Sequence, residues 1–447
     1  MSELPIGWTL ASIGDICGQP AQRAPSADEE LTYIDIASVD RHLKTVSEPQ
    51  RLLGADAPSR ARKLVDKGDV IVSMTRPNLN AVALIGEQHS GCVASTGFDV
   101  LKPIEVEPRW IFSAVRSARF VDAMCEKVQG ALYPAVKSAD IRDYEIPLPP
   151  LAEQTRIDAK LGELLAQVDT LKARIDAIPM LLKRFRQSVL AAAVSGRLTE
   201  EWRRVRCKSP EDQSFVYPVR KLGVLARFID YRGKTPEKVE SGIPLITAKN
   251  IRPGYISREP QEFIRPEAYE GWMTRGLPQV GDVVITTEAP LGNVAVIDIK
   301  ERFALAQRAI CLQFHEGFLS SFAAIALQSP LLQEDLVRRS TGTTVKGIKA
   351  SVLKEIDLPA PTIDEQTEIV RRVEQLFAFA DQLEAKVASA KSRIDPLTQS
   401  ILAKAFRGEL VPQDPNDEPA SVLLERIKAQ RAAAPKAKRG RRAATLS

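Results

Sequence analysis

The sequence predicts an α+β protein: two mixed α/β globules, separated by long helices that pack as an antiparallel coiled coil, with a pseudo-two-fold internal repeat. Three observations carry this prediction. The chain repeats itself at a long offset, each copy opens with short apolar runs punctuated by Gly, Pro and Asn, and each copy closes with apolar residues at heptad spacing. A repeat of this length indicates duplication of a whole domain with its appendage rather than a solenoid.

The repeat is fixed by several separate anchors. Ser188–Leu198 matches Ser400–Leu410, at an offset of 400 − 188 = 212 residues. The same offset relates further pairs of identical residues, namely Glu153 and Glu365, Gln154 and Gln366, Gly130 and Gly342, and Lys137 and Lys349. Because these anchors lie in different parts of each copy, the chain contains two complete copies of one unit.

Each globule is expected to hold strands first and a helical stretch after them. The globules span residues 1–150 and 216–361. Asp69–Met74 and Asp282–Thr287 predict strands, and each is followed by a turn containing Pro or Asn and a second apolar run, at 81–85 and 294–297. The helical stretches are expected at 110–128 and 318–339.

The helical spacers span 151–200 and 362–430, with a linker at 201–215 and a basic disordered tail at 431–447. In the first spacer the apolar residues advance in alternating steps of four and three, at Ile157, Leu161, Leu164, Val168, Leu171, Ile175 and Ile178. The second spacer repeats the alternation, which predicts coiled-coil packing. Thr362-Ile-Asp-Glu365 predicts a capping box. Pro179 predicts either a kink or a short break in the first helix.

Composition restricts the class of protein. The net charge of +5 includes eight Lys or Arg and no acid between Arg426 and Ser447, so the rest of the chain carries 5 − 8 = −3. A nucleic-acid surface would therefore need local placement of charge. The chain has no apolar run of membrane length, no signal core and five well-separated cysteines, so we expect a cytoplasmic protein with reduced thiols.

Motifs of common catalytic sites are absent from the sequence. The three histidines stand singly, and neither Asn-Pro-Pro-aromatic nor Asp-Pro-Pro-aromatic, which an amino-methyltransferase needs, occurs. There is no Gly-x-Gly-x-x-Gly, and Gly342–Ile348 lacks the Gly-Lys-Ser/Thr ending of a phosphate loop. We therefore predict no catalytic residue and no metal site.

The joint between globule and helix carries a resemblance to a known family. It reads Ile146-Pro-Leu-Pro-Pro-Leu-Ala-Glu-Gln154-x-x-Ile157 in the first copy, and Ile356-Asp-Leu-Pro-Ala-Pro-Thr-Ile-Asp-Glu-Gln366-x-x-Ile369 in the second. A glycine followed seven residues later by a lysine stands upstream in both copies, and heptads follow. The chain resembles the specificity (S) subunit of type I restriction-modification systems over nearly its whole length, the basic tail excepted.

The resemblance implies a DNA-reading subunit with no catalytic site or cofactor of its own. Each globule would be a target recognition domain for one half of a bipartite, asymmetric site on double-stranded DNA. The helices would set the spacing and dock two modification (M) subunits, which bind S-adenosylmethionine and methylate adenine, and two restriction (R) subunits would join them. About 35 helical residues span roughly 50 Å, more than one DNA turn of roughly 34–36 Å.

Two other interpretations stay open on the residues alone. The chain could be a single-chain DNA methyltransferase or nuclease with duplicated recognition domains, although the missing tetrapeptide argues against a methyltransferase. It could also be a coiled-coil scaffold that binds only proteins. Methylation by the chain alone would support the first, and an assembled complex with no preferred DNA site would support the second.

Loops that differ between the copies are the candidates for reading bases. Gly18–Ala24 takes the place of Asp230–Pro236, Ser95-Thr96 aligns with Gln307-Arg308, and Leu132-Tyr133 aligns with Thr344-Val345. A common frame with distinct loops predicts a non-palindromic site.

The candidate DNA contacts are side chains that match base edges or phosphates. In the first globule they are Arg23, Arg76, Asn78, Asn80, Thr96, Tyr133 and Lys137. In the second they are Arg232, Lys234, Lys249, Asn250, Asn293, Gln307, Arg308, Thr343, Lys346 and Lys349. Among them the candidate guanine readers are Arg76 and Arg308, the adenine readers Asn80, Asn250 and Gln307, and the phosphate anchors Lys137 and Lys349. A structural role is equally open for each, such as a turn for Asn78 and Asn80 or the core for Tyr133.

Overall fold

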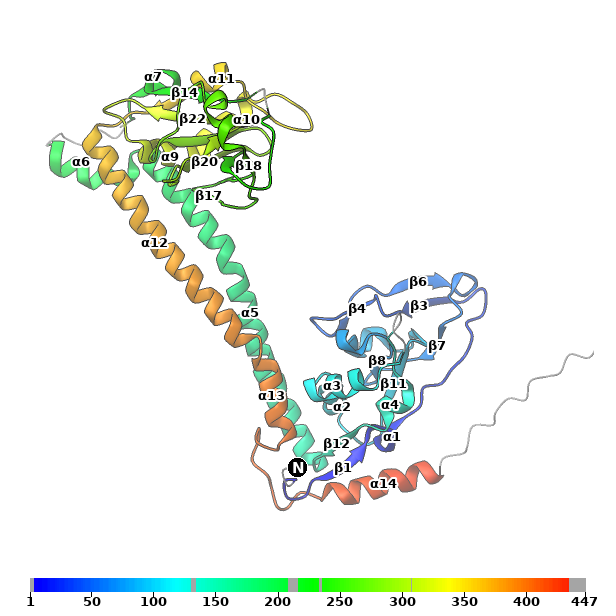
Figure 1. Cartoon of the computed structure of the whole chain (residues 1–447). Helices are drawn as coiled ribbons and strands as arrows, with labels where there is room; N and C mark the ends of the chain where they lie inside the picture. The colour runs from blue at the N-terminus through cyan, green and yellow to red at the C-terminus, as the bar shows by residue number, and fades with distance from the viewer. Residues whose placement is uncertain (1–3, 130–133, 208–215, 233–234, 307, 434–447) are drawn as a thin grey trace, which may run out of the picture. The chain divides into compact units, whose positions relative to one another are not determined.

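The computed structural model describes residues 4–129, 134–207, 216–232, 235–306 and 308–433 (Figure 1). The chain forms two compact units. Unit 1 comprises Met1–Arg174 and Ala390–Ser447, and unit 2 comprises Ile175–Ser389. Each unit therefore contains one globule together with parts of both helical spacers, and the chain returns to its first globule at its end.

Unit 1 is built on an antiparallel sheet whose strand order is β2-β11-β8-β9. These strands are Cys17–Gly18, Phe98–Pro103, Val70–Ser73 and Val82–Leu84. A second sheet has the order β6-β3-β10-β7, formed by Gln50–Leu53, Glu30–Ile34, Val93–Ser95 and Ala61–Leu64, in which β10 runs parallel to β3. The remaining strands pair as β1 with β12 and β4 with β5, namely Thr9–Ser12, Glu145–Leu148, Val39–Asp40 and Thr45–Val46.

Unit 2 repeats this topology. Its main sheet has the order β14-β22-β19-β20, formed by Ala226–Asp230, Ala309–Phe314, Val283–Thr287 and Leu291–Val296. The second sheet is β18-β15-β21, formed by Phe263–Ile264, Ile243–Ile246 and Ala304–Leu305, and β15 again runs parallel to β21. The other pairs are β13 with β23 and β16 with β17, namely Val219–Lys221, Asp357–Pro359, Ile251–Arg252 and Tyr255–Ile256. The strand order thus confirms the duplication.

The predicted helical stretch of each globule is a pair of short helices. They are α2 and α3 in unit 1, Pro108–Val115 and Ala118–Glu126, and α9 and α10 in unit 2, Ser320–Gln328 and Pro330–Arg339. The break occurs because a serine caps the second helix: the Ser117 hydroxyl accepts from the Phe120 amide, and Ser329 does the same with Leu332. Shorter helices and 3-10 turns complete the globules, namely α1 Ile13–Ile16, α4 Ser138–Arg142, α7 Leu222–Leu225, α8 Tyr269–Trp272, α11 Ala350–Lys354, η1 Gly54–Asp56, η2 Pro77–Leu79, η3 Glu87–His89 and η5 Pro266–Ala268.

The first spacer is one helix, α5, from Leu151 to Val194, and it continues through Pro179. The proline therefore does not break the helix. It is exposed, so that water can reach the carbonyl that loses its partner. The predicted linker at 201–215 is partly helical, because η4 (Arg197–Thr199) and α6 (Glu200–Cys207) follow α5.

The second spacer consists of three helices. They are α12 Ile363–Ile394, α13 Leu397–Phe406 and α14 Ala420–Ala433. The prediction of one helical spacer to residue 430 was therefore incomplete: 407–419 is not helical, and α14 covers the start of the predicted tail. Residues 434–447 lie outside the described residues.

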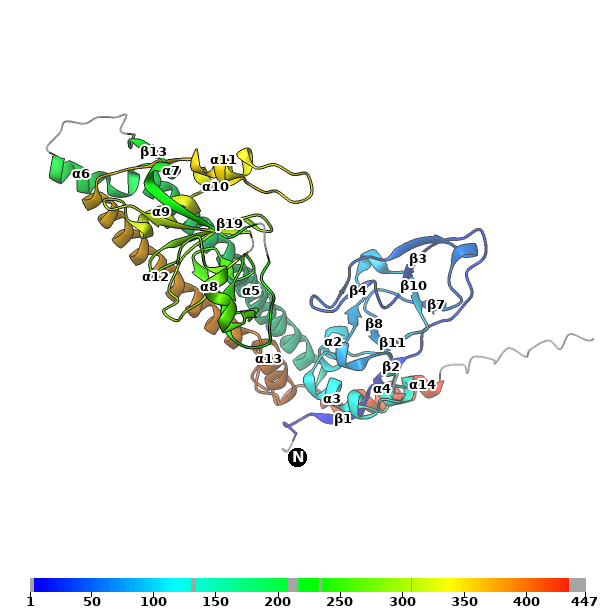
Figure 2. The same cartoon turned by 45° about the horizontal axis from the view of Figure 1, so that its top comes forward.

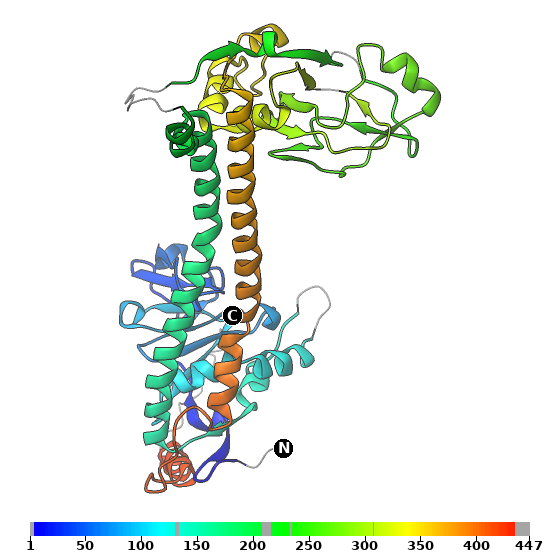
Figure 3. The ribbon, with the colours of Figure 1, turned by 90° about the vertical axis from the view of Figure 1, so that its left-hand side faces the viewer.

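The helices pack in antiparallel fashion within unit 2 (Figure 3). Arg186, near the end of α5, forms ion pairs with Asp381 and Glu384 late in α12. Arg372, early in α12, donates to the Leu198 carbonyl, beyond the end of α5, at 2.8 Å. As the chain advances from Arg186 to Leu198, the partner residue on α12 moves back from Asp381 to Arg372. The two helices therefore run in opposite directions, as predicted from the heptads.

In unit 1 the last helices complete the core of the globule. Trp110 on α2 packs against Phe406 of α13, with ring centroids 4.5 Å apart. Helix α14 lies against the first strand and helix of the globule (Figure 1 and Figure 2), and the side chains of Leu423 and Ile427 are buried there. The Arg431 guanidinium also donates to the Asp15 carbonyl at 2.8 Å. The helices α13 and α14 therefore belong to the first globule.

Candidate nucleic-acid interface

A buried glutamine closes each joint between globule and helix. Gln154 and Gln366 are 0% and 1% exposed. The Gln154 side-chain oxygen accepts from the Glu107 amide at 3.0 Å, and its nitrogen donates to the Pro149 carbonyl at 2.8 Å. Gln366 makes the same two bonds 366 − 154 = 212 residues later, at 2.8 and 2.9 Å. The repeated glutamine is therefore a structural device that fixes each long helix on its globule.

The glutamate before it is held firmly in unit 2. Glu365 accepts hydrogen bonds from the hydroxyls of Thr199 and Tyr217, both at 2.7 Å, and forms an ion pair with Arg203. Thr362 accepts from the Glu365 amide at 3.4 Å, as a capping box requires. The reciprocal half of the box does not form, because the Glu365 carboxylate points into this buried network instead.

The corresponding glutamate of unit 1 has fewer partners. Glu153 is 1% exposed and accepts one hydrogen bond, from the Trp8 indole nitrogen at 2.9 Å. Its other oxygen has no hydrogen-bond partner among the described residues. Burial raises the pKa of Glu153, and the Trp8 hydrogen bond only partly offsets this. The equivalent glutamates therefore differ in their partners: Glu365 has an ion pair with Arg203, whereas Glu153 has only the hydrogen bond from Trp8 among the described residues.

Several loops converge at one end of the main sheet in each unit. In unit 2 this loop end comprises Asp230–Arg232, Glu288–Pro290, Arg308 and Thr341–Lys349. The Thr287 amide donates to the Arg308 carbonyl at 2.7 Å, and the Ile348 amide donates to the Thr287 carbonyl at 3.0 Å. Main-chain bonds therefore hold these loops together.

Unit 1 contains the same arrangement. Its loop end comprises Thr75–Pro77, Gly97 and the described part of the third loop, Pro134–Lys137. The Met74 amide donates to the Gly97 carbonyl, and the Val136 amide donates to the Met74 carbonyl, both at 2.9 Å. The two loop ends thus have one hydrogen-bonded frame.

This frame corrects the sequence alignment at one position. Phe98 lies opposite Ser73 in unit 1, and Ala309 lies opposite Thr286 in unit 2. The residue just before this strand is therefore Gly97 in one unit and Arg308 in the other. The alignment of Thr96 with Arg308 was wrong by one residue, because the strand offset here is 309 − 98 = 211.

Arg232 braces the loop end of unit 2. Its guanidinium donates to both oxygens of Asp230, at 2.9 and 2.7 Å, and to the Ile348 carbonyl at 3.2 Å. Burial opposes ionisation of Asp230, but the bonds from Arg232 outweigh it and hold the pKa of Asp230 below its usual value. Arg308 is more exposed, with one ion pair from its Nε to Glu288 at 3.3 Å.

Two predicted base readers of unit 2 serve the fold instead. Asn250 is 1% exposed, accepts from both the amide and the hydroxyl of Thr247, and donates to the carbonyls of Ser257 and Pro260. The interpretation of Asn250 as an adenine reader was wrong, because no part of its amide faces solvent. Asn293 lies within β20 and donates to the Ile251 carbonyl at 2.9 Å. Lys249 is exposed and pairs with Glu262 at 3.2 Å.

In unit 1 the candidates also separate into bound and exposed side chains. Arg23 is held by Glu29, and this bond lowers the pKa of Glu29 to about 2. The Asn80 amide donates to the Val115 carbonyl at 2.8 Å and accepts from Lys44 at 2.9 Å, which disfavours its role as an adenine reader. Burial, together with nearby Arg116, lowers the pKa of Lys44 to about 8.

The remaining candidates lie at or near the loop ends. Those with exposed side chains are Arg76, Asn78 and Lys137 in unit 1 and Thr343, Lys346 and Lys349 in unit 2. Lys137 and Lys349 both stand at the start of a short helix, α4 and α11. Thr96 is half-buried, and its amide donates to the Arg60 carbonyl at 2.8 Å. Tyr133, Lys234 and Gln307 lie outside the described residues.

Sequence reasoning missed Glu288. This residue occupies the place of Thr75, since both form an isolated bridge to the third loop, with Gly347 and Ala135 respectively. An acid in one copy and a neutral residue in the other was the available signal. The prediction overlooked it because no carboxylate was considered as a DNA contact.

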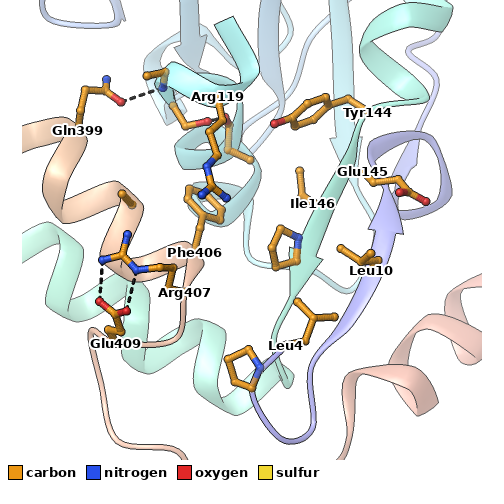
Figure 4. A pocket seen from close by; sticks show the side chains of 16 residues that line it. Leu4, Leu10, Arg119, Tyr144, Glu145, Ile146, Gln399, Phe406, Arg407 and Glu409 are labelled. Carbon is orange, nitrogen blue, oxygen red and sulfur yellow. Dashed lines mark hydrogen bonds and ion pairs between the residues drawn. The ribbon is translucent and has the colours of Figure 1, made fainter. Parts of the chain in front are cut away.

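A separate groove of about 910 Å³ lies in unit 1 (Figure 4). Leu10, Tyr144 and Ile146 line it from the globule, and Phe406 lines it from α13. It shares no residue with the loop end.

Among the described residues no group of three or more His, Cys, Asp or Glu side chains could hold a metal ion. No helix among the residues that the structure describes is both long and apolar enough to cross a membrane.

Comparison with known proteins places this architecture in one family. The family model for the type I restriction modification DNA specificity domain matches residues 5–180 and 237–389. The specificity subunit of the type I restriction enzyme EcoKI from Escherichia coli K12 is 35% identical over 82% of this chain and 81% of its own length. The EcoBI specificity subunit from Escherichia coli is 40% identical over 67% of each chain.

Solved structures agree with the sequence matches. A chain from "Structural basis underlying complex assembly and conformational transition of the type I R-M system" is 25% identical, with a TM-score of 0.70, and the match covers 92% of this chain and 100% of that one. The crystal structure of the HsdS subunit from Thermoanaerobacter tengcongensis gives 26% identity and a TM-score of 0.63, over 91% and 98% of the two chains. With two recognition units, a long helix and these relatives, the chain belongs to the family of type I restriction-modification specificity subunits.

Proposed function

We propose that each loop end reads one half of a bipartite, asymmetric site on double-stranded DNA, and that the chain directs partner enzymes without catalysing a reaction. The observation that carries the proposal is the pair of loop ends, in which one main-chain frame presents different side chains. Phosphate contacts position a protein on DNA, whereas base contacts specify sequence. Side chains common to both units, Lys137 and Lys349, suit the first task, and those that differ suit the second.

The proposed partners are two modification subunits, which bind S-adenosylmethionine and methylate adenine, and two restriction subunits. Exposed apolar side chains on the long helices of unit 2 support a docking surface for the modification subunits. Met180 and Leu181 on α5 and Phe379 on α12 are 62%, 57% and 55% exposed. Contiguous apolar side chains exposed on a surface indicate protein contacts, and Met180 and Leu181 are adjacent in the chain. The cytoplasmic location expected from the sequence stays a prediction.

The docking proposal is tested by co-purification with the modification subunit. Leu181→Asp together with Phe379→Asp should abolish recovery of the complex, because each buries a charge in the contact. Gln187→Asp, at an exposed polar position of the same helix, is the matched control and should leave recovery unchanged. Full recovery of the double variant would refute docking at this face.

The reading proposal is tested by modification-sensitive long-read sequencing of cells that express the chain with its modification subunits. We expect a split motif with a methylated adenine in each half, and loss of that motif when this chain is deleted. The single-chain methyltransferase alternative predicts methylation by the purified chain and S-adenosylmethionine alone. A complex that methylates with no split motif would refute the proposal.

A further inference from the structure

One arginine at each loop end combines a positive φ with an exposed side chain. Arg76, just after β8, has φ of +48°, and Arg308, just before β22, has φ of +61°. Left-handed backbone is unfavourable for long side chains, and such residues cluster at ligand-binding sites, where the surrounding structure enforces them. Here the enforcing structure is the main-chain frame, because the Arg76 amide donates to the Pro134 carbonyl at 2.8 Å and the Arg308 carbonyl accepts from Thr287.

The two arginines occupy positions that do not correspond to each other. The counterpart of Arg76 is Ala289, at an offset of 289 − 76 = 213, and Ala289 also has a positive φ, of +43°. The counterpart of Arg308 is Gly97, which has no side chain. Each loop end therefore has two positions for a reading side chain. Each unit has arginine at one of them and a small residue, Gly97 in unit 1 or Ala289 in unit 2, at the other.

The guanidinium groups of Arg76 and Arg308 also keep hydrogen-bond donors available for DNA, unlike those of Arg23 and Arg232. Arg76 makes no ion pair or hydrogen bond through its side chain with any residue that the structure describes. Arg308 is 55% exposed, and Glu288 engages only its Nε, so within the described chain both terminal nitrogens keep their donors. By contrast, Arg23 and Arg232 each donate hydrogen bonds from two guanidinium nitrogens to one carboxylate, that of Glu29 and of Asp230 respectively.

A free, planar fork of donors is the side chain best suited to guanine, whose O6 and N7 accept two parallel bonds in the major groove. We propose, building on the reading function above, that each half-site contains one guanine, read by Arg76 in the half-site of unit 1 and by Arg308 in that of unit 2. Arg76 follows β8, whereas Arg308 precedes β22, so the two arginines start from different places in the common frame. The guanine in each half-site should therefore lie at a different distance from the base pair nearest the equivalent lysine, Lys137 or Lys349. Glu288 acts as a positioning residue that orients Arg308.

The first test reads the methylation motif of the whole complex in cells. Arg76→Ala should relax one G·C position in one half-site and leave the other half unchanged, and Arg308→Ala should do the reverse, so each variant controls for the other. We expect discrimination at that position to fall about 5- to 150-fold, the range for one bidentate contact. Arg76→Lys keeps the charge but lacks the fork, so it should relax the same position.

The second test holds even where a variant no longer methylates in cells. Duplexes that carry 7-deazaguanine lack the N7 acceptor, so binding of the assembled wild-type complex should weaken at one guanine in each half. The Arg76→Ala complex should be insensitive to the analogue in its own half and remain sensitive in the other.

Three results would overturn the inference. One is a half-site without a G·C pair, another is equal sensitivity of wild type and variant to the analogue, and the third is a uniform loss of binding with an unchanged motif, which marks a phosphate contact. A wild-type complex without any split motif would instead refute the reading function itself.

Discussion

Replacing the buried glutamate by glutamine should have opposite consequences at its two equivalent positions. Glu365→Gln should destabilise unit 2 by about 3–5 kcal/mol, the cost of breaking a buried ion pair from one side. Glu153→Gln should change the stability of unit 1 by less than about 1 kcal/mol, or raise it, because it removes a buried charge that makes no ion pair within the described chain, nearby Arg156 being paired with Asp417 instead. The chemical change is identical, so only the environment separates the outcomes.

The magnitudes follow from the contacts. The side chains of Arg203 and Glu365 are 13% and 6% exposed, so the substitution removes the Glu365 charge from a largely buried guanidinium. In unit 1, glutamine keeps an oxygen that can accept from Trp8, now at 2.9 Å from the carboxylate, and ends the cost of burying Glu153 as an anion.

The pH dependence provides an independent check on Glu153. Its pKa is raised in the folded state, so the folded chain holds this proton more tightly than the unfolded chain does. The stability of unit 1 should therefore fall as pH rises from the ordinary glutamate pKa through the raised value, and then stay level. Glu153→Gln should remove this part of the slope.

Hydrogen exchange of the full chain in increasing urea, read by mass spectrometry, reports each unit separately. We expect earlier exchange in unit 2 for Glu365→Gln and unchanged or later exchange in unit 1 for Glu153→Gln. Equal destabilisation by the two substitutions would refute the reasoning, since it would mean that Glu153 has an ion-pair partner as strong as Arg203.

Three further predictions concern other parts of the molecule. Lys137→Ala and Lys349→Ala should each weaken DNA binding of the complex on all sequences alike, and each should reduce the slope of log affinity against log salt by about 1. Asn250→Ala should lower the free energy of unfolding by about 1–3 kcal/mol in urea titrations and leave the methylation motif unchanged, because the amide is buried and bonded. Ile427→Ala should destabilise unit 1 by about 2–5 kcal/mol, whereas Val422→Ala, at a position 47% exposed, should stay within about 0.5 kcal/mol in the same titration.

The fold was predictable where the sequence pattern reflects burial. All residues of Val70–Ser73 and Val283–Thr287 are buried, so their apolar runs at equivalent places indicated the centre of each sheet. The heptads indicated the helix seam in part: Ile157, Val168 and Val373 are buried, whereas Leu171, at a predicted seam position, is 44% exposed. The apolar strand runs and the heptads each occur in both copies of the repeat, so each pattern could be checked at two places in the sequence.

Features set by long-range contacts were not predictable. The polar residues before α14 gave no indication that Leu423 and Ile427 pack on the first strand and helix of the first globule, more than 400 residues earlier in the chain. The bonding of Arg232 and Asn250 could not be foreseen either, because a cation or amide in a loop has the same appearance in a sequence whether it faces DNA or the fold. Their partners, Asp230 and Thr247, identify the role only once the loops are placed.

The construction of the loop ends explains how one scaffold can present different readers. The bonds that hold each loop end run between main-chain groups, from Thr287 to Arg308 in unit 2 and from Met74 to Gly97 in unit 1, so they survive a change of side chain. Substitution of an exposed side chain there should alter stability by no more than about 0.5 kcal/mol. A base contact is worth about 1–3 kcal/mol of discrimination. Specificity can therefore change at Arg76 or Arg308 by more than the fold loses, whereas the buried Gln154 offers no such freedom.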